Sequence, residues 1–402
     1  MAMPNRPQPA SRSLIAVVAG AALLVACTSS KKASNASSTT TTWSSTSPPA
    51  TAPTSAVTEP GVSTTVAAPP VATGFSPDSV TFVSLKEGWA LGTNCSTCPL
   101  AIVHTTDSGR TWTSIPAPPA NPNLQTFLPD KIRFATPDDG WVYGDVGLWS
   151  THDGGAHWAQ PAQPAGLGPG PFDLEASAGT VYAVNMNNND MFDIETSPVG
   201  HDGWTLTGSS LPVGAGPIPQ IQMVLHGSSG WIVENDRIVV AGERLQSGHW
   251  SEWTPPCTKA AGEALLSASA SAAVHLVAYC PPSDYATSPP GSVGLYFSTD
   301  GDTFGAPVTL PAALTRSGPL ASASPSQATL AAPASDGKGQ LESTFDGGRT
   351  WTVVTATASN AWTDLGFTSS SQGVAVQRRL DSSPGALYMT FDGGHSWRQV
   401  NF

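Results

Sequence analysis

A short motif that occurs four times constrains the fold of this chain more than any other feature. The segments at positions 105–112, 151–158, 344–351 and 390–397 share the pattern Thr-x-Asp-x-Gly-x-x-Trp. This pattern predicts a hairpin turn in which the aspartate carboxylate accepts backbone N–H bonds, the glycine adopts a positive φ and the tryptophan folds back as an apolar plug. We call these segments aspartate turns. Their defining positions are Asp107, Gly109 and Trp112; Asp153, Gly155 and Trp158; Asp346, Gly348 and Trp351; and Asp392, Gly394 and Trp397.

The aromatic plug is a register mark that reveals three further, weaker copies of the motif. The seven marks are Trp112, Trp158, Trp204, Trp253, Phe304, Trp351 and Trp397, with successive spacings of 46, 46, 49, 51, 47 and 46 residues. Val199 and Gly248 stand where the third and fourth copies should have their aspartate, and the fifth copy is one residue shorter. Seven marks at a nearly constant period predict seven structural units. Since the aromatic residue persists where the aspartate does not, we expect its packing to matter more than the turn carboxylate.

Each unit also has the pattern of four short strands. In the second unit, alternating apolar and polar residues at 131–136 are followed by a turn, a Gly-Trp strand at 140–144 and a third strand that enters the aspartate turn. The 39 glycines and 37 prolines, with only 11% charged residues, favour many short strands over amphipathic helices. The sequence therefore predicts an all-β fold, a seven-bladed β-propeller of four-stranded antiparallel blades. We expect blade 7 to close the ring by packing on blade 1, helped by residues 71–75.

The aspartate turns resemble the Asp-box, also called the BNR repeat. From about residue 74 to 402 the chain resembles exported Asp-box propellers of the photosystem II assembly-factor type and, more distantly, the sialidase propellers. These motifs specify architecture, and one fold supports many functions. The resemblance therefore implies the fold but not the ligand.

The N-terminal region has the features of an export signal. Arg6 and Arg12 precede an apolar stretch at 14–26, which is too short to span a bilayer comfortably, and Cys27 follows small residues directly after it. This arrangement resembles the lipobox, in which the cysteine receives a diacylglycerol; an ordinary secretory signal is the alternative. We therefore expect a lipoprotein signal peptide at 1–26, a lipidated Cys27 with a disordered Ser/Thr/Pro-rich tether at 27–73, and the propeller at 74–402. The protein would be exported and lipid-anchored to the outer face of the bacterial cell membrane.

The four remaining cysteines are an even number in an exported domain, which favours disulfides. Blades 1 and 5 lie too far apart on the ring for a bridge between them. This favours Cys95 with Cys98 and Cys257 with Cys280. A redox role for the Cys95-x-x-Cys98 pair is the alternative, but the pair lies in a loop between strands without the helix N-terminus that lowers a thiol pKa.

Catalytic groups are sparse on the expected inner strands, which are 81–85, 131–136, 172–177, 220–226, 263–269, 320–325 and 364–369. The resemblance to sialidases implies three arginines, a tyrosine nucleophile assisted by a glutamate, and an aspartate acid/base. Only Arg133 is an arginine on these strands, so sialidase activity is not expected. Weak candidates for other glycoside hydrolysis are the carboxylates Glu175, Glu263 and Asp364. We favour a non-enzymatic binding or assembly-scaffold module, with an extracellular glycoside hydrolase as the alternative.

The charge and composition of the chain limit the classes of partner and cofactor that we expect. The net charge of −12 disfavours nucleic acid, whose phosphates require a basic surface. The oxygen-rich segment 185–190 lacks the alternating aspartates and glycine of a calcium loop, so we expect a polar turn and no metal or other cofactor. The expected partner is an extracellular protein or glycan, membrane contact is through the lipid alone, and the chain is expected to be a monomer.

The topology of a propeller predicts where binding would occur. Within a blade, the turns after the first and third strands lie on one face of the ring, and the other loops lie on the opposite face. The aspartate turns follow third strands, so irregular loops gather on the opposite face, where a rigid scaffold would support binding. The alternative is that these loops are merely tolerated. The predicted ligand-face residues are Asn188, Asp236, Tyr285 and Arg378.

Overall fold

A computed structural model describes residues 70–402, except positions 72, 96–97, 120–128, 145, 216–219, 258–261, 272, 282–292, 312–313, 315–317, 334–337, 358–360 and 379–383. The predicted signal peptide, Cys27, nearly all of the tether and Tyr285 lie outside the described residues. Within the described part, no helix is long and apolar enough to cross a membrane.

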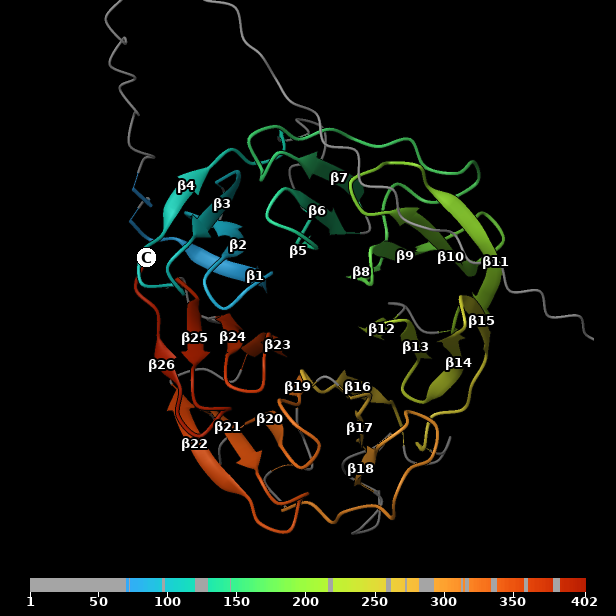
Figure 1. Cartoon of the computed structure of the whole chain (residues 1–402), viewed down its shortest axis with the longest axis vertical. Coiled ribbons are helices and arrows are strands. Elements are labelled where there is room, and N and C mark those ends of the chain that lie inside the picture. The colour runs from blue at the N-terminus through green and yellow to red at the C-terminus, as the bar shows by residue number, and fades with distance from the viewer. Residues whose placement is uncertain are drawn as a thin grey trace, which may run out of the picture. The chain divides into compact units, whose positions relative to one another are not determined.

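The strands form seven antiparallel sheets that surround a central axis as the blades of a propeller (Figure 1), which confirms the predicted fold. Blades 1 to 4 contain β1 (Ser76–Phe82), β2 (Gly88–Thr93), β3 (Leu100–Thr105) and β4 (Thr113–Ile115); β5 (Lys131–Phe134), β6 (Asp139–Gly144) and β7 (Gly147–His152); β8 (Asp173–Ser177), β9 (Thr180–Met186), β10 (Met191–Pro198) and β11 (Thr205–Pro212); and β12 (Gln220–His226), β13 (Ser229–Asn235), β14 (Val239–Gln246) and β15 (His249–Glu252). Blades 5 to 7 contain β16 (Leu265–Ala268), β17 (Leu276–Cys280) and β18 (Gly294–Ser298); β19 (Leu320–Ala321), β20 (Ala328–Pro333), β21 (Gly339–Thr344) and β22 (Thr352–Thr357); and β23 (Ala361–Phe367), β24 (Gly373–Arg378), β25 (Ala386–Thr390) and β26 (Arg398–Gln399). In blades 2 and 5 the fourth strand is reduced, in the described residues, to isolated bridges such as Ser150 with Ala159 and Leu295 with Val308.

The inner strands β1, β5, β8, β12, β16, β19 and β23 border the axis (Figure 1). The prediction for β12 has the observed bounds, whereas the predictions for β1 and β23 begin several residues late. The reason is a break in the alternation near the start of these two strands, where the pairing register shifts between Pro77 and Ser79 and between Trp362 and Asp364.

Two kinds of tryptophan fill the interfaces between blades. Trp89, Trp141 and Trp231 follow the glycine at the start of a second strand, are completely buried, and pack against the next blade. The aromatic plugs pack against the preceding blade instead, as Trp158 does on blade 1 and Trp204 does on blade 2. An interface can therefore receive one large aromatic ring from each side, which is efficient apolar burial.

The fourth register mark differs from the prediction. Trp250, which pairs with Leu245 in β15, is buried among blade 3 and blade 4 residues, where the plug of the fourth unit belongs. Trp253 is only half-buried and packs on the opposite side, toward blade 5. The corrected mark restores a spacing of 46 residues from Trp204 and lengthens the interval to Phe304 to 54 residues. A two-residue hairpin at Ser247 and Gly248, both with positive φ, shortens the turn and moves the plug forward.

Packing between blades 7 and 1 closes the ring, as the sequence predicted. Val80 and Val103 of blade 1 share one buried cluster with Val376 and Leu387 of blade 7. The chain enters the same seam at Pro70, which bridges to Thr113, and it ends there at Phe402. The Phe402 ring lies 4.8 Å from the Phe75 ring and 5.4 Å from the Trp112 ring, centroid to centroid. Both ends of the propeller therefore contribute to its closure.

Candidate functional site

The aspartate turns have the hydrogen bonds that the motif predicts. Asp107 Oδ1 accepts the backbone N–H groups of Arg110 at 3.0 Å and Thr111 at 2.9 Å, and Gly109 has a φ of 74°. Desolvation alone would raise the pKa of Asp107, but hydrogen bonds from Thr111 and Thr105 outweigh it and lower the pKa to about 2. The hydrogen bonds of this carboxylate, to Thr105, Arg110 and Thr111, lie inside its own turn, so its role is structural.

A second motif on the same face was missed in the sequence. The hydroxyls of Ser84, Thr136 and Ser369, in the turn after the first strand, accept backbone N–H groups two and three residues later. The aspartate turn of the same blade then donates an N–H to this inner turn. The four such bonds are Ser108 to Lys86, Gly154 to Asp138, Gly347 to Ser326 and Gly393 to Ser371, at 2.8–2.9 Å. A Ser or Thr three residues before an acidic residue or glutamine, itself followed by Gly, is the sequence signal of blades 1, 2 and 7.

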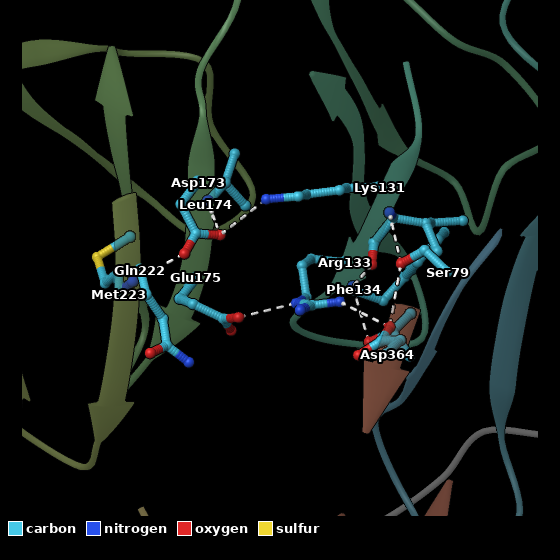
Figure 2. Close-up of polar contacts among 12 residues, drawn as sticks. Ser79, Lys131, Arg133, Phe134, Asp173, Leu174, Glu175, Gln222, Met223 and Asp364 are labelled. Carbon is cyan, nitrogen blue, oxygen red and sulfur yellow. Dashed lines mark hydrogen bonds and ion pairs between the residues drawn. The ribbon is translucent and has the colours of Figure 1, made fainter. Parts of the chain in front are cut away.

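Three of the four candidate catalytic residues converge on the central axis, each from a different blade (Figure 2). Arg133 of β5 donates its Nε–H to Glu175 Oε1 of β8 at 2.9 Å, and its Nη1 lies 4.0 Å from Asp364 Oδ2 of β23. About a quarter of each of these side chains is exposed. The structure therefore brings Arg133, Glu175 and Asp364 together, with the guanidinium between the two carboxylates.

The pKa shifts of Arg133 and Glu175 are consistent with their close contact. Desolvation alone would lower the pKa of Arg133, but the charges of Glu175 and Asp364 raise it well above its ordinary value. Desolvation raises the pKa of Glu175, and Arg133 opposes that rise. Glu263 belongs elsewhere: it precedes β16, and desolvation together with the nearby charge of Asp236 raises its pKa. Glu263 is thus not part of the Arg133 cluster.

Most inner strands are joined to the next by a side chain that accepts a backbone N–H. In the described residues the six such bonds are from Ile132 to Ser79 Oγ at 3.3 Å, Phe134 to Thr81 Oγ1 at 3.4 Å, Met223 to Asp173 Oδ2 at 2.7 Å, Leu266 to Gln222 Oε1 at 2.8 Å, Ser322 to Ser267 Oγ at 3.0 Å, and Val80 to Asp364 Oδ2 at 3.3 Å. Between blades 2 and 3, Lys131 Nζ instead donates to the Phe172 carbonyl at 2.8 Å. It also lies 3.9 Å from Asp173 Oδ1 (Figure 2). Asp364 therefore holds blade 7 to blade 1, because its carboxylate accepts the Val80 N–H across the seam.

Asp173 and Tyr143 complete this network and were not singled out in the sequence. The Tyr143 hydroxyl, which is completely buried, donates toward the Leu174 carbonyl at 3.1 Å and lies 3.3 Å from Asp173 Oδ1. Asp173 opens an inner strand that also contains Glu175, so its position is a weak sequence signal. Tyr143 lies among the apolar residues of β6, where nothing in the sequence distinguishes it from a core residue.

The predicted ligand-face residues have different surroundings. Asn188 is exposed on the loop between β9 and β10, and Asp236 is half-buried after β13. Arg378 is exposed, and its Nη2 donates to Asp78 Oδ1 at 3.1 Å across the seam between blades 7 and 1. One member of the predicted face therefore also contributes to ring closure.

The oxygen-rich segment 185–190 forms a polar turn. Asn187 Oδ1 accepts the backbone N–H groups of Asn189 at 2.8 Å and Met191 at 3.2 Å, which is the local bonding expected of asparagine in a turn. Nowhere in the described residues do three His, Cys, Asp or Glu side chains form a group that could hold a metal ion.

Both expected disulfides are present. The Cα atoms of Cys95 and Cys98 are 5.0 Å apart, and those of Cys257 and Cys280 are 5.3 Å apart. Cys95 is exposed, whereas Cys257 and Cys280 are buried between blades 4 and 5. The second disulfide therefore cross-links the long chain segment between the fourth plug, Trp250, and the fifth, Phe304.

Similar solved structures share the fold. No protein-family model matches the sequence, and no curated protein matches it. YCF48 from Cyanidioschyzon merolae is 16% identical, with a TM-score of 0.53 over 80% of this chain and 97% of that one. A structure of YCF48 bound to D1 peptide is 17% identical, with a TM-score of 0.53 over 81% and 99%. The BP39L lectin from Burkholderia pseudomallei is 14% identical, with a TM-score of 0.54 over 81% and 100%. At these identities the similarity establishes the propeller fold alone.

Proposed function

We propose that this chain is an exported, lipid-tethered and non-enzymatic binding module. It recognises an extracellular protein or glycan through the face opposite the aspartate turns. The chain is divided as the sequence predicts, into a signal peptide at 1–26, a lipidated Cys27 with a tether that extends to residue 73, and an Asp-box propeller at 74–402.

One observation supports a binding role over catalysis. In the described inner strands, every ionisable side chain already contacts a group of the neighbouring blade. Asp78 pairs with Arg378, Arg133 with Glu175, Lys131 and Asp173 bond backbone groups of the next blade, His226 lies 2.7 Å from the Ser271 carbonyl, and Asp364 bonds Val80. Each of these groups therefore already has a structural contact between blades, which favours a role in holding the ring together over a role as a general acid or a nucleophile.

Two further observations are consistent with an exported binder. Disulfides persist in oxidising compartments outside the cytoplasm, and the chain has two. Among the similar propellers, one YCF48 structure holds a peptide and another protein is a lectin. A propeller of this shape can thus present either a peptide or a sugar site on a rigid ring.

A combined activity and binding screen tests the proposal. The propeller is assayed with fluorogenic glycosides and sialosides and is probed on a glycan array and a peptide array. We expect no turnover and expect retention on one of the arrays. Turnover that Glu175→Gln abolishes would instead establish the glycoside hydrolase alternative.

The face is tested with a pair of matched variants. The ligand-face variant replaces Asn188, Asp236, Tyr285 and Arg378 by alanine, and the control replaces the exposed Arg110 and Arg349 of two aspartate turns. We expect the first variant to lose array binding and the control to keep it. Loss in the control alone would place binding on the aspartate-turn face.

The anchor is tested separately. Cys27→Ser should move the protein from the membrane fraction to the soluble fraction with its propeller intact, because the acyl chains supply the membrane affinity. Unchanged membrane retention would contradict lipidation at Cys27.

A further inference from the structure

A buried polar nest in blade 3 contains an acid, Glu195, that forms no ion pair with any residue that the structure describes. Glu195 of β10 and Asn185 of β9 lie on the same side of the sheet, and both are completely buried. Gln163 and Gly168, from the linker between blades 2 and 3, contact them. This linker and the β9–β10 loop lie on the predicted ligand face.

If Glu195 is charged, this nest has more buried hydrogen-bond acceptors than donors. Gln163 Nε2 donates to Glu195 Oε1 at 3.1 Å, and Asn185 Nδ2 donates to the Gly168 carbonyl at 3.4 Å. The Asn185 amide also lies close enough to the Glu195 carboxyl to oppose the rise of its pKa. Glu195 Oε2 and Asn185 Oδ1 are both buried without a donor. A buried acceptor without a donor is destabilising, and here two occur in one nest.

One proton supplies both missing contacts. A protonated Glu195 would donate from one oxygen to Asn185 Oδ1 while its other oxygen accepts amide hydrogens, so the carboxylic acid and the amide form a reciprocal pair. The nearby charge of Asp193 favours the neutral acid. Between positions 147 and 212, which include all of blade 3, the sequence has no Lys or Arg, and Lys131 and Arg133 lie on the inner strand of blade 2.

The titratable groups on the elements packed in this region are mostly acidic: β6 has Asp139 and Tyr143, and β8 has Asp173 and Glu175. Asp193 lies two residues away on β10, and its charge opposes ionisation of Glu195. Asp190 lies in the adjoining loop, β9 contributes only Tyr182, and neither β11 nor the linker segment 159–172 has a charged side chain. His152 of β7 lies in the aspartate-turn region and pairs there with Asp139 and Asp202.

We propose that Glu195 carries a proton in the folded protein and that the Glu195–Asn185 pair is a proton-dependent latch for the adjoining ligand-face segments. These segments are the linker 163–168 and the loop 185–190. Gly168 donates to the Met186 carbonyl at 2.8 Å, and Asn188 donates to the Gly166 carbonyl at 3.0 Å, so the two segments are joined directly. Ionisation of Glu195 would leave two unpaired oxygens beneath this junction.

The latch changes state near neutral pH. Burial is the main cause that raises the pKa of Glu195, from an ordinary value of 4.5 to about 7. The native state therefore binds more protons than the unfolded state between these two values. The stability that the protonated pair contributes falls as pH rises from 4.5 to about 7, and it levels off above that.

Glu195→Gln is the decisive variant, because its amide donates where the protonated acid would. We measure the melting temperature of the wild type, Glu195→Gln and the exposed-residue control Glu252→Gln at pH 5, 6, 7 and 8. Amide hydrogen exchange of residues 163–168 and 185–190 is followed in parallel. We expect the wild type and the control to lose a few degrees relative to Glu195→Gln between pH 5 and pH 8, with faster exchange in both segments.

A direct titration keeps the proposal falsifiable if the variant folds poorly. The carboxyl carbon of Glu195, observed by NMR in the wild type, should titrate with a midpoint near 7. A midpoint below 5, or equal pH dependence of stability in the wild type and Glu195→Gln, would overturn the latch.

Discussion

Blades 1, 2, 6 and 7 differ from blades 3 and 4 in how their outer turns are held. In the first group the turn bonds are internal, as in Asp346, whose Oδ1 accepts the Thr350 N–H at 2.9 Å. In blade 3 the Ser197 hydroxyl instead donates to the His201 carbonyl, and Asp202 accepts hydrogen bonds from blade 2, including one from Ser150 at 2.8 Å. Blade 4 replaces the turn by a tight hairpin. A turn carboxylate is therefore dispensable where a neighbouring blade or a shorter turn takes its place, but the buried aromatic plug is not.

The plugs give the largest expected effect and test the corrected register. Trp397→Ala in blade 7 and Trp250→Ala in blade 4 should each cost about 3–5 kcal/mol, because each empties a buried interface. Trp253→Ala, at a half-buried position, should cost clearly less. Denaturant unfolding measures all three, and equal losses for Trp250 and Trp253 would contradict the corrected mark.

The two disulfides should stabilise the fold to different extents, because one of them closes the long segment between the plugs Trp250 and Phe304. Replacing Cys257 and Cys280 by serine opens a closed loop with a separation of 23 residues and should cost about 3 kcal/mol. Replacing Cys95 and Cys98, separated by 3 residues on an exposed loop, should cost about 2 kcal/mol. Melting curves under non-reducing conditions provide the measurement. A larger loss from the second pair would argue against this cross-linking role.

The turn carboxylates should control stability in acid. Backbone and side-chain hydrogen bonds from Thr350 lower the pKa of Asp346 from 3.8 to about 2. Its contribution is therefore complete above pH 4 and is lost as pH falls toward 2. In Asp346→Asn, the free energy of unfolding should therefore fall less between pH 4 and pH 2 than it does in the wild type. The counterpart Val199→Asp should be nearly neutral at pH 7, because the blade 3 turn lacks the same bonding; a gain in stability would break the comparison.

The smallest expected effect concerns the contact that replaces the turn bonds in blade 3. His152 Nδ1 lies 2.8 Å from Asp139 and its Nε2 lies 3.3 Å from Asp202. Desolvation would lower the pKa of His152, but hydrogen bonds to both aspartates raise it. The stability from this contact is therefore present below pH 6.5 and lost as pH rises through the raised pKa. His152→Ala should lower the melting temperature more at pH 6 than at pH 9, whereas the exposed-residue control His249→Ala should not.

The sequence predicts the repeat better than the site. The fold and both disulfides follow from features that recur or pair along the chain. The fourth plug was misplaced because Trp250 and Trp253 are three residues apart and only packing distinguishes them. The bonds between inner strands join residues from different blades, such as Asp364 and Val80, so no local pattern reports them. Glu195 reads in sequence as an ordinary solvated carboxylate, since its burial depends on the linker that covers it.

The closing seam also determines how the ring bears a load. Residue 70 and Phe402 both lie in the contact between blades 1 and 7, so tension between the two ends acts across that contact and not along a strand inside a blade. The ring should then open at the seam and lose terminal blades one after another. Each blade of about 46 residues would release about 160 Å of extended chain. For the same reason, any chain that continues beyond Phe402 leaves the propeller from inside its closure.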